Sequence, residues 1–212
     1  HPDPLWHESD AHAWVAGLSR VAAALGVAGA GPIDAVVVSG NGPTLVPVAA
    51  EGAPLAPAMT WMDRRGVEEA RIVAEASGAP TDPTFSLPKA LWIFRNRPRL
   101  YEQARWFFSC PEYLAFVLTG IPSMFLPTPE YTRFMWSEPL IAALGMDPRK
   151  FPPFVPSGRI LGSVSAAGAA ATGIPAGVPV VSGGPDFIVS LLGTATVAPG
   201  RACIRAGTSE GI

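Results

Sequence analysis

The sequence predicts an α/β protein with a mainly parallel or mixed sheet that helices cover. Short β-branched, apolar runs alternate along the chain with segments of helical periodicity, which is the order typical of such a sheet. The 212 residues are 49% hydrophobic and 15% charged, so they supply enough apolar material for a substantial core. Pro and Gly are common, at 24 and 22 residues, which favours many short elements joined by tight turns.

The first part of the chain is predicted to contain a helix, a strand, a hairpin and a second helix. Gly26 follows the first apolar helical face as a stop signal, Asp63 is placed to cap the second helix, and Gly78 is placed to end it. The expected ranges are a helix over 10–25, a strand over 33–39, a hairpin from 44–48 and 55–60, and a helix over 63–77.

The rest of the chain is predicted to be helical first and then to alternate again. Pro111 lies in the first turn of one expected helix, and Gly120 and Gly173 follow the ends of two others. The expected helices cover 89–96, 99–105, 111–118, 138–144, 165–172 and 187–192, and the expected strands cover 159–164, 178–182 and 201–206.

Charge and cysteine content exclude several classes of function. The formal net charge is −2 and no basic block is present, so we expect no nucleic-acid partner. Cys110 and Cys203 match no metal-binding spacing, and we assign no metal ligands. No apolar run approaches the ~18 residues of a membrane span, and His1–Pro4 does not resemble a signal peptide. We therefore expect a cytoplasmic protein with no membrane partner.

Asp186 is the first candidate functional residue. The apolar run 178–182 leads into a Gly-Gly-Pro segment, expected to form a sharp turn, and then into this carboxylate. Open α/β sheets place their functional groups at the C-terminal ends of buried strands. By position alone, Asp186 fits either a functional carboxylate or the N-cap of the helix that follows, and one Asp can fill both roles.

Residues 207–211 match the G-x-S-x-G pattern of a hydrolase nucleophile. That reading needs a histidine downstream, whereas all three histidines lie within the first twelve residues. A second interpretation is a turn in which Gly207, Thr208 and Ser209 offer backbone N–H groups and hydroxyls to a phosphate. An ordinary surface turn is the third.

Two further loops are candidate ligand contacts. Trp61 could offer its face to a sugar ring and Asp63 could accept hydrogen bonds from hydroxyls, although a helix-capping Asp63 fits the spacing equally well. Asn41 lies in a glycine-rich loop that fits either a close approach of backbone to a ligand or a simple tight turn.

Taken in order, these segments resemble the N-terminal half of the FGGY family of carbohydrate kinases. Each segment is short, and the order and spacing of all of them carry the resemblance. The matching segments are residues 6–10, 33–47, 51–65, 87–98, 110–120, 172–186 and 206–209.

The resemblance implies an actin-like ATPase, ribonuclease H-like fold: a mixed sheet flanked by helices. It implies a sugar-binding N-terminal domain over 1–197, lacking its first strands, and the start of a nucleotide-binding domain over 198–212. The activity implied is ATP- and Mg²⁺-dependent phosphorylation of a small sugar or polyol. Asp186 matches the general base, and the turn formed by Gly207, Thr208 and Ser209 matches one that faces the ATP phosphates. Asn41, Trp61 and Asp63 match positions that line the sugar pocket.

The chain also departs from the family pattern. No strand hairpin with an Asp-x-Gly-Thr phosphate turn precedes His1, and the C-terminal half that holds the adenine is absent. We therefore expect this chain to be the sugar-binding part of a longer kinase and to be inactive alone. Residues 39–42 lack the Met-His pair typical of the xylulose-type subgroup, which leaves the sugar open. The alternative is a non-catalytic sugar-binding or regulatory relative, and the oligomeric state, a homo-oligomer included, is left open.

Overall fold

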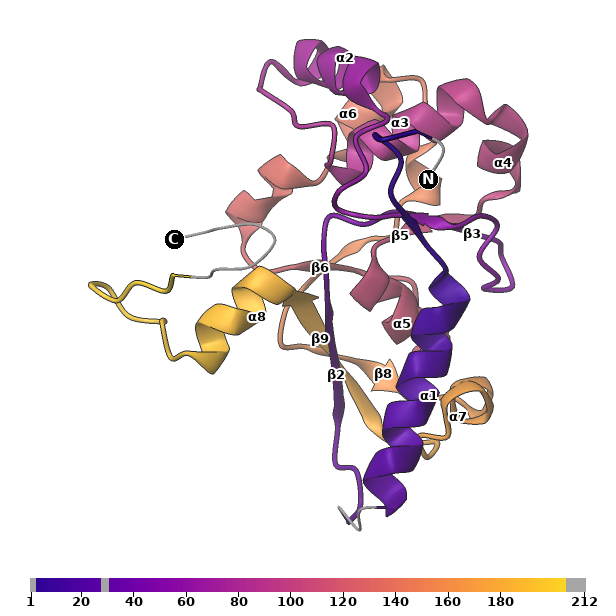
Figure 1. Cartoon of the computed structure of the whole chain (residues 1–212), viewed down its shortest axis with the longest axis vertical. Helices are drawn as coiled ribbons and strands as arrows, with labels where there is room; N and C mark the ends of the chain where they lie inside the picture. Colours follow the sequence, from indigo (N-terminus) through magenta and orange to yellow (C-terminus); the bar gives the residue numbers. More distant parts are fainter. Residues whose placement is uncertain (1–2, 28–30, 205–212) are drawn as a thin grey trace.

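The computed structural model describes residues 3–27 and 31–204, and its centre is a mixed three-stranded sheet (Figure 1). The strand order is β2-β9-β8, with β2 and β9 parallel and β8 antiparallel to β9. These strands are β2 (Val36–Gly40), β8 (Ile160–Ser163) and β9 (Pro179–Pro185). The alternation of strands and helices therefore gives the mixed sheet that the sequence predicts.

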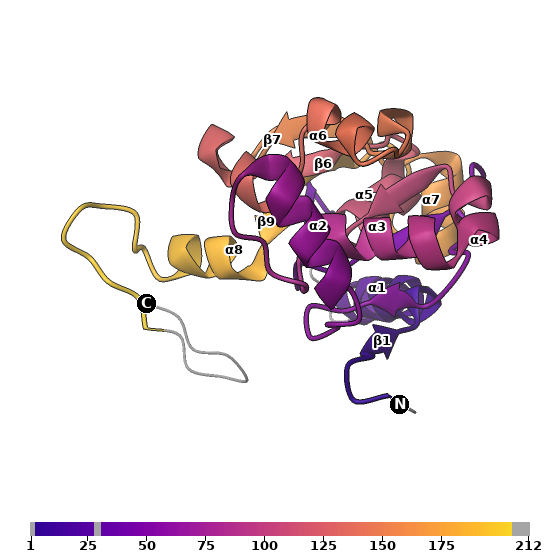
Figure 2. The ribbon, with the colours of Figure 1, turned by 90° about the horizontal axis from the view of Figure 1, so that it is seen from above.

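Helices cover this sheet and extend from its end. Helix α5 packs against β2 and β9, and α1 and α7 pack against α5 (Figure 1). Helix α8 follows β9 directly and projects from the side of the molecule in both views (Figure 2). The bounds are α1 (Ala11–Val27), α5 (Cys110–Thr119), α7 (Ala166–Thr172) and α8 (Asp186–Gly193).

Most of the remaining elements form the other end of the molecule, whereas β6 lies beside β9. The ladders β1-β4 and β3-β5 are antiparallel and β6-β7 is parallel. The strands are β1 (Glu8–Ser9), β3 (Val46–Val48), β4 (Ala58–Met59), β5 (Trp106–Phe108), β6 (Met124–Leu126) and β7 (Phe154–Pro156). The helices are α2 (Val67–Ser77), α3 (Ser86–Asn96), α4 (Pro98–Gln103) and α6 (Glu138–Ala143), with 3-10 turns η1 (Pro129–Phe134) and η2 (Pro148–Lys150).

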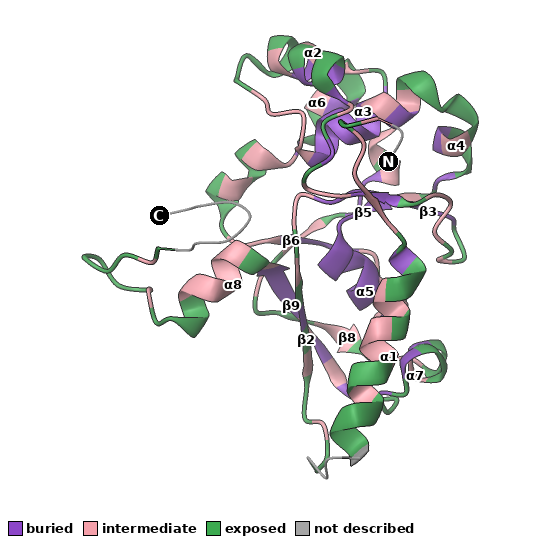
Figure 3. Ribbon diagram, viewed as in Figure 1, coloured by how far each residue is buried: buried purple, intermediate pink, exposed green. Residues whose placement is uncertain are grey.

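The buried side chains of the described residues form three clusters, and the two larger ones lie toward opposite ends of the molecule. One cluster is built around α3, and the other lies between the sheet and α5 (Figure 3). Helix α5 is buried along most of its length, because the sheet lies on one side of it and α1 and α7 on another. This packing therefore fixes the first turn of α5 near the ends of β2 and β9.

The Gly-Gly-Pro segment before Asp186 is the end of a strand, which corrects the predicted turn. Strand β9 continues through Gly183 to Pro185. A Cβ on Gly183 would lie 1.9 Å from the carbonyl oxygen of Val38, so this glycine allows β2 to approach β9 closely. The glycines serve close strand packing, which the sequence does not show because Val38 is distant along the chain.

The structure corrects four other expectations. Asp63 does not cap α2, since that helix begins at Val67 and its N-cap is Gly66. Helix α1 continues through Gly26 to Val27. The expected hairpin is reduced to two isolated bridges, because β3 pairs mainly with β5 and β4 with β1. Within the described part of the expected last strand, residues 201–204, no strand forms.

Candidate active site

The parallel pairing of β2 and β9 brings two predicted loops to the same edge of the sheet. Gly40 lies opposite Pro185 in the register, so the loop that contains Asn41 and the start of α8 leave the sheet side by side. The Ser39 hydroxyl donates a hydrogen bond of 3.0 Å to the Gly184 carbonyl and ties the two strand ends together. This edge is where open α/β sheets bind their ligands.

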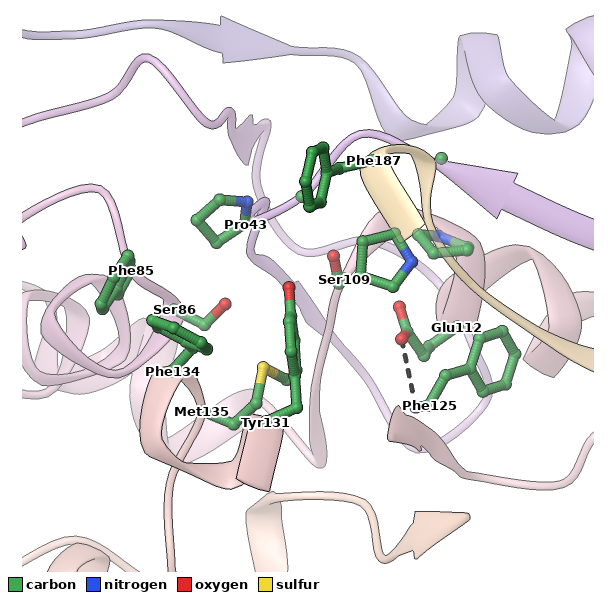
Figure 4. Close-up of a pocket in the computed structure, with 14 residues that line it drawn as sticks. Pro43, Phe85, Ser86, Ser109, Glu112, Phe125, Tyr131, Phe134, Met135 and Phe187 are labelled. Atoms are coloured by element: carbon green, nitrogen blue, oxygen red, sulfur yellow. Dashed lines mark hydrogen bonds between the residues drawn. The ribbon is translucent and has the colours of Figure 1, made fainter. Parts of the chain in front are cut away.

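A cavity of about 270 Å³ opens at this edge (Figure 4). Aromatic and proline side chains supply most of its wall. Phe85 and Phe134 lie at one end in the view and Glu112 and Phe125 at the other, with Tyr131 between them. The lining residues are Gly40, Gly42, Pro43, Phe85, Ser86, Ser109, Pro111, Glu112, Phe125, Tyr131, Phe134, Met135, Pro185 and Phe187.

Asp186 lies beside this cavity as the first residue of α8. It is exposed, and its Oδ1 accepts a hydrogen bond of 2.7 Å from the N–H of Phe187. The N-cap residue is Pro185, so Asp186 is not the N-cap, although its side chain binds an N–H of the first turn. Burial raises the pKa of Tyr131, as do the charges of Glu112 and Asp186. The Tyr131 phenol therefore lies within the field of both carboxyl groups.

Asn41 is exposed at the tip of its loop. Its Oδ1 accepts a hydrogen bond of 3.3 Å from the Thr44 hydroxyl. The residues on either side of it, Gly40 and Gly42, both line the cavity. Among the predicted site residues that the structure describes, Asn41 and Asp186 are thus the two whose chain neighbours form the cavity wall.

Lys89 connects the cavity loop to the loop that contains Trp61. Its buried Nζ donates hydrogen bonds of 2.7 Å to the carbonyl oxygens of Pro43 and Thr60. Burial lowers the pKa of Lys89 to about 7. A neutral amine keeps two N–H groups, so both bonds persist in either protonation state. Trp61 is half-buried beside Thr60, and the described residues that line the cavity do not include it.

Asp63 is fully buried in a cluster of its own. Both carboxylate oxygens accept hydrogen bonds from the Arg65 guanidinium, at distances from 2.6 to 3.1 Å, and the His7 N–H donates to Oδ2. Arg65 also pairs with Glu8 and lies 3.9 Å from the centre of the Trp6 ring. The structure therefore places Asp63 in an ion-pair network, and the described lining of the cavity does not include it.

Glu112 lines the cavity and was missed by the sequence analysis. It lies in the first turn of α5 and is 4% exposed. Its Oε1 accepts a hydrogen bond of 3.2 Å from the Phe125 N–H, whereas Oε2 has no partner among the described residues. Burial raises its pKa to about 7. The sequence signal that could have identified Glu112 is its position as the one acid in the otherwise apolar segment 110–118.

The turn predicted to face the ATP phosphates is not part of the described structure. Gly207, Thr208 and Ser209 lie outside the described residues. Within residues 3–27 and 31–204, no group of three or more His, Cys, Asp or Glu side chains comes together as a metal site. We therefore assign Mg²⁺ no ligands in the described part of the chain and derive no step through it.

Comparison with known proteins identifies the family. The FGGY family of carbohydrate kinases, N-terminal domain, matches residues 1–193. The chain belongs to this family. Xylulose kinase of Escherichia coli (strain K12) is 28% identical over 224 residues, which cover 98% of the chain and 46% of that kinase. Autoinducer-2 kinase of Klebsiella pneumoniae subsp. pneumoniae is 32% identical over 142 residues, 64% of the chain and 26% of that protein.

A solved structure of a family member has a similar fold. The crystal structure of xylulose kinase from Rhodospirillum rubrum superposes with a TM-score of 0.85 at 27% identity, covering 94% of the chain and 45% of that kinase. Membership of the FGGY family and the mixed α/β architecture confirm the expected actin-like, ribonuclease H-like fold. The chain spans about half the length of the xylulose kinases that it matches. In its described part, no helix is both long and apolar enough to cross a membrane.

Proposed function

We propose that this chain is the sugar-binding part of an ATP-dependent kinase that phosphorylates a hydroxyl of a pentulose or a related sugar or polyol. The observation that carries the proposal is the cavity at the ends of β2 and β9, with Asp186 beside it, in a chain of the FGGY family. Relatives named xylulose kinase cover nearly the whole chain, which favours a pentulose as the acceptor.

In this proposal Asp186 is the general base. Phosphoryl transfer depends on in-line positioning and charge stabilisation more than on covalent help from the protein. The acceptor hydroxyl attacks the γ-phosphorus of ATP, its proton passes to the Asp186 carboxylate, and ADP leaves. The carboxylate is exposed beside the cavity, so a hydroxyl of a bound sugar can reach it.

The other predicted residues have supporting roles in the proposal. Asn41 contacts the sugar from the loop that forms one wall, and Trp61 contacts it from the loop that Lys89 ties to that wall. Asp63 acts through Arg65, by fixing this second loop. Gly207, Thr208 and Ser209 face the ATP phosphates, and Mg²⁺ accompanies the nucleotide.

The proposal is tested with the full-length protein that contains this chain. Pentuloses, hexuloses and polyols are incubated with ATP and Mg²⁺, and ADP release is measured for each acceptor. We expect ADP release with at least one pentulose. Sugar binding without ADP release would support the non-catalytic, regulatory alternative, and neither binding nor turnover across the panel would overturn the proposal.

A further inference from the structure

Glu112 differs from the rest of the cavity lining. Among the described lining residues it is the one acidic or basic side chain, and its neighbours are mainly aromatic rings and prolines. Its side chain points toward the cavity from the end opposite Phe85 and Phe134 (Figure 4). A carboxyl group in such a wall loses its contacts with water and needs hydrogen bonds in exchange.

The structure provides only half of those hydrogen bonds. The Phe125 N–H binds Oε1, and Oε2 has no partner in the described part of the chain. A buried polar atom without a partner destabilises the folded protein, and native proteins contain few of them. A hydroxyl of a bound ligand would satisfy this oxygen.

The position of Glu112 connects it to the proposed reaction. Tyr131 lies between its end of the cavity and Phe134, and the charges of both Glu112 and Asp186 raise the pKa of its phenol. Pro185 and Phe187, on either side of Asp186, belong to the same cavity wall as Glu112. An acceptor held at Glu112 therefore lies beside the carboxylate that would take its proton.

We propose that Glu112 is an acceptor-binding residue that sets specificity: its Oε2 forms a hydrogen bond with one non-reacting hydroxyl of the sugar, while the aromatic wall packs against the C–H face. This inference rests on the proposed function. It names a second substrate-contacting carboxyl group, with a role distinct from that of Asp186. The Phe and Pro side chains of the wall offer no hydrogen bond, so a sugar hydroxyl that lies against them, and not against Glu112 or the Ser109 and Tyr131 hydroxyls, is disfavoured.

The test pairs a change in the protein with a change in the sugar. Full-length wild type, Glu112→Leu and Glu112→Gln are assayed with D-xylulose and with its 1-deoxy, 3-deoxy and 4-deoxy analogues. The readouts are Kd by calorimetry, and KM and kcat. One analogue should bind wild type roughly 10- to 100-fold more weakly than D-xylulose, the loss expected for a hydrogen bond to a carboxyl group.

For that analogue, Glu112→Leu should cause no further loss, whereas for D-xylulose it should raise Kd and KM by the same factor with kcat little changed. Glu112→Gln keeps the shape and the bond to the Phe125 N–H and should restore part of the D-xylulose affinity. The matched control is Glu69→Gln, because Glu69 is also 4% exposed but pairs with Arg95 outside the cavity.

Two results would overturn the inference in different ways. If wild type phosphorylates D-xylulose and both Glu112 variants bind all four sugars as wild type does, Glu112 is not an acceptor-binding residue and the proposed function stands. If wild type neither binds nor phosphorylates D-xylulose, the pentulose assignment fails, and this inference fails with it.

Discussion

Asp63 and Glu112 are both acids buried in the protein, but their surroundings are opposite. Asp63 is fully buried, and Arg65 and the His7 N–H satisfy both of its oxygens. Glu112 is almost as buried, yet the Phe125 N–H binds one of its oxygens and the other has no partner in the described residues. Burial alone therefore does not identify a functional acid. The hydrogen-bond partners of the carboxylate distinguish the two cases. A carboxylate with both oxygens bound stabilises the fold, and one with an unbound oxygen beside a cavity is available to a ligand.

The largest effect is expected from breaking the satisfied cluster. Arg65→Met leaves the Asp63 carboxylate buried without its cation, which should lower the free energy of unfolding by about 3–5 kcal/mol. Urea denaturation followed by tryptophan fluorescence measures the change. The control is Arg71→Met, which removes an exposed pair with Glu68 and Glu75 and should leave stability nearly unchanged. Equal losses in the two variants would show that the Asp63 cluster is no more important than a surface ion pair.

The next largest effect is a pH dependence due to Glu112. Its pKa rises from 4.5 to about 7 on folding, so between these values the folded state binds more protons than the unfolded state. Stability should therefore fall as pH rises from 4.5 to 7, by about 3 kcal/mol for this group, and level off above pH 7.

Glu112→Gln should lack that fall. The groups whose charges interact with Glu112, namely Cys110 and Tyr131, are present in both proteins. Lys89, whose pKa burial lowers to about 7, is also present in both, so its contribution cancels in their difference. The difference in unfolding free energy between the two proteins, measured at pH 4.5 and pH 8, isolates the Glu112 contribution. A difference that does not change with pH would mean that Glu112 is not half-satisfied as described.

A smaller effect is expected where β2 and β9 hold the cavity edge together. Gly183→Ala places a methyl group against the Val38 carbonyl, and pushing the strands apart should cost about 2 kcal/mol. Gly184→Ala is the matched control, because its added Cβ would lie 3.6 Å from the Ser157 hydroxyl oxygen, an ordinary contact distance. Thermal unfolding compares the two. Equal stability would contradict the close approach of the strands.

Local signals in the sequence predicted much of the fold and less of the site. Helices α5 and α7 end at the glycines that the sequence marks, because Gly120 and Gly173 adopt the left-handed conformation that a residue with a side chain disfavours. The role of Gly183 depends on Val38, which is distant in the chain. The role of Asp63 depends on its neighbour Arg65 and on the distant His7 N–H. The capping prediction at Asp63 was wrong because α2 begins only at Val67, and the turn prediction at Gly183 was wrong because β9 continues through this residue against Val38.

In the candidate site, too, local sequence signals predicted some residues and missed one whose role depends on packing. The sequence singled out Asp186 and the loop that contains Asn41, and β2–β9 pairing brings both to one edge. Glu112 was missed because an acid in the first turn of a helix is common and locally favourable. Only the packing of α5 against the sheet shows that its second oxygen is buried without a partner in the described residues. The predicted roles of Asn41, Trp61, Asp63 and Asp186 stay predictions.

The central claim, that Asp186 is the general base beside an acceptor cavity, is tested most directly by Asp186→Asn in the full-length protein. Both kcat and the Kd of D-xylulose are measured. We predict that kcat falls by a factor of about 10² to 10⁴, the usual contribution of a general base, while Kd changes little. A variant that keeps the wild-type kcat would contradict the account.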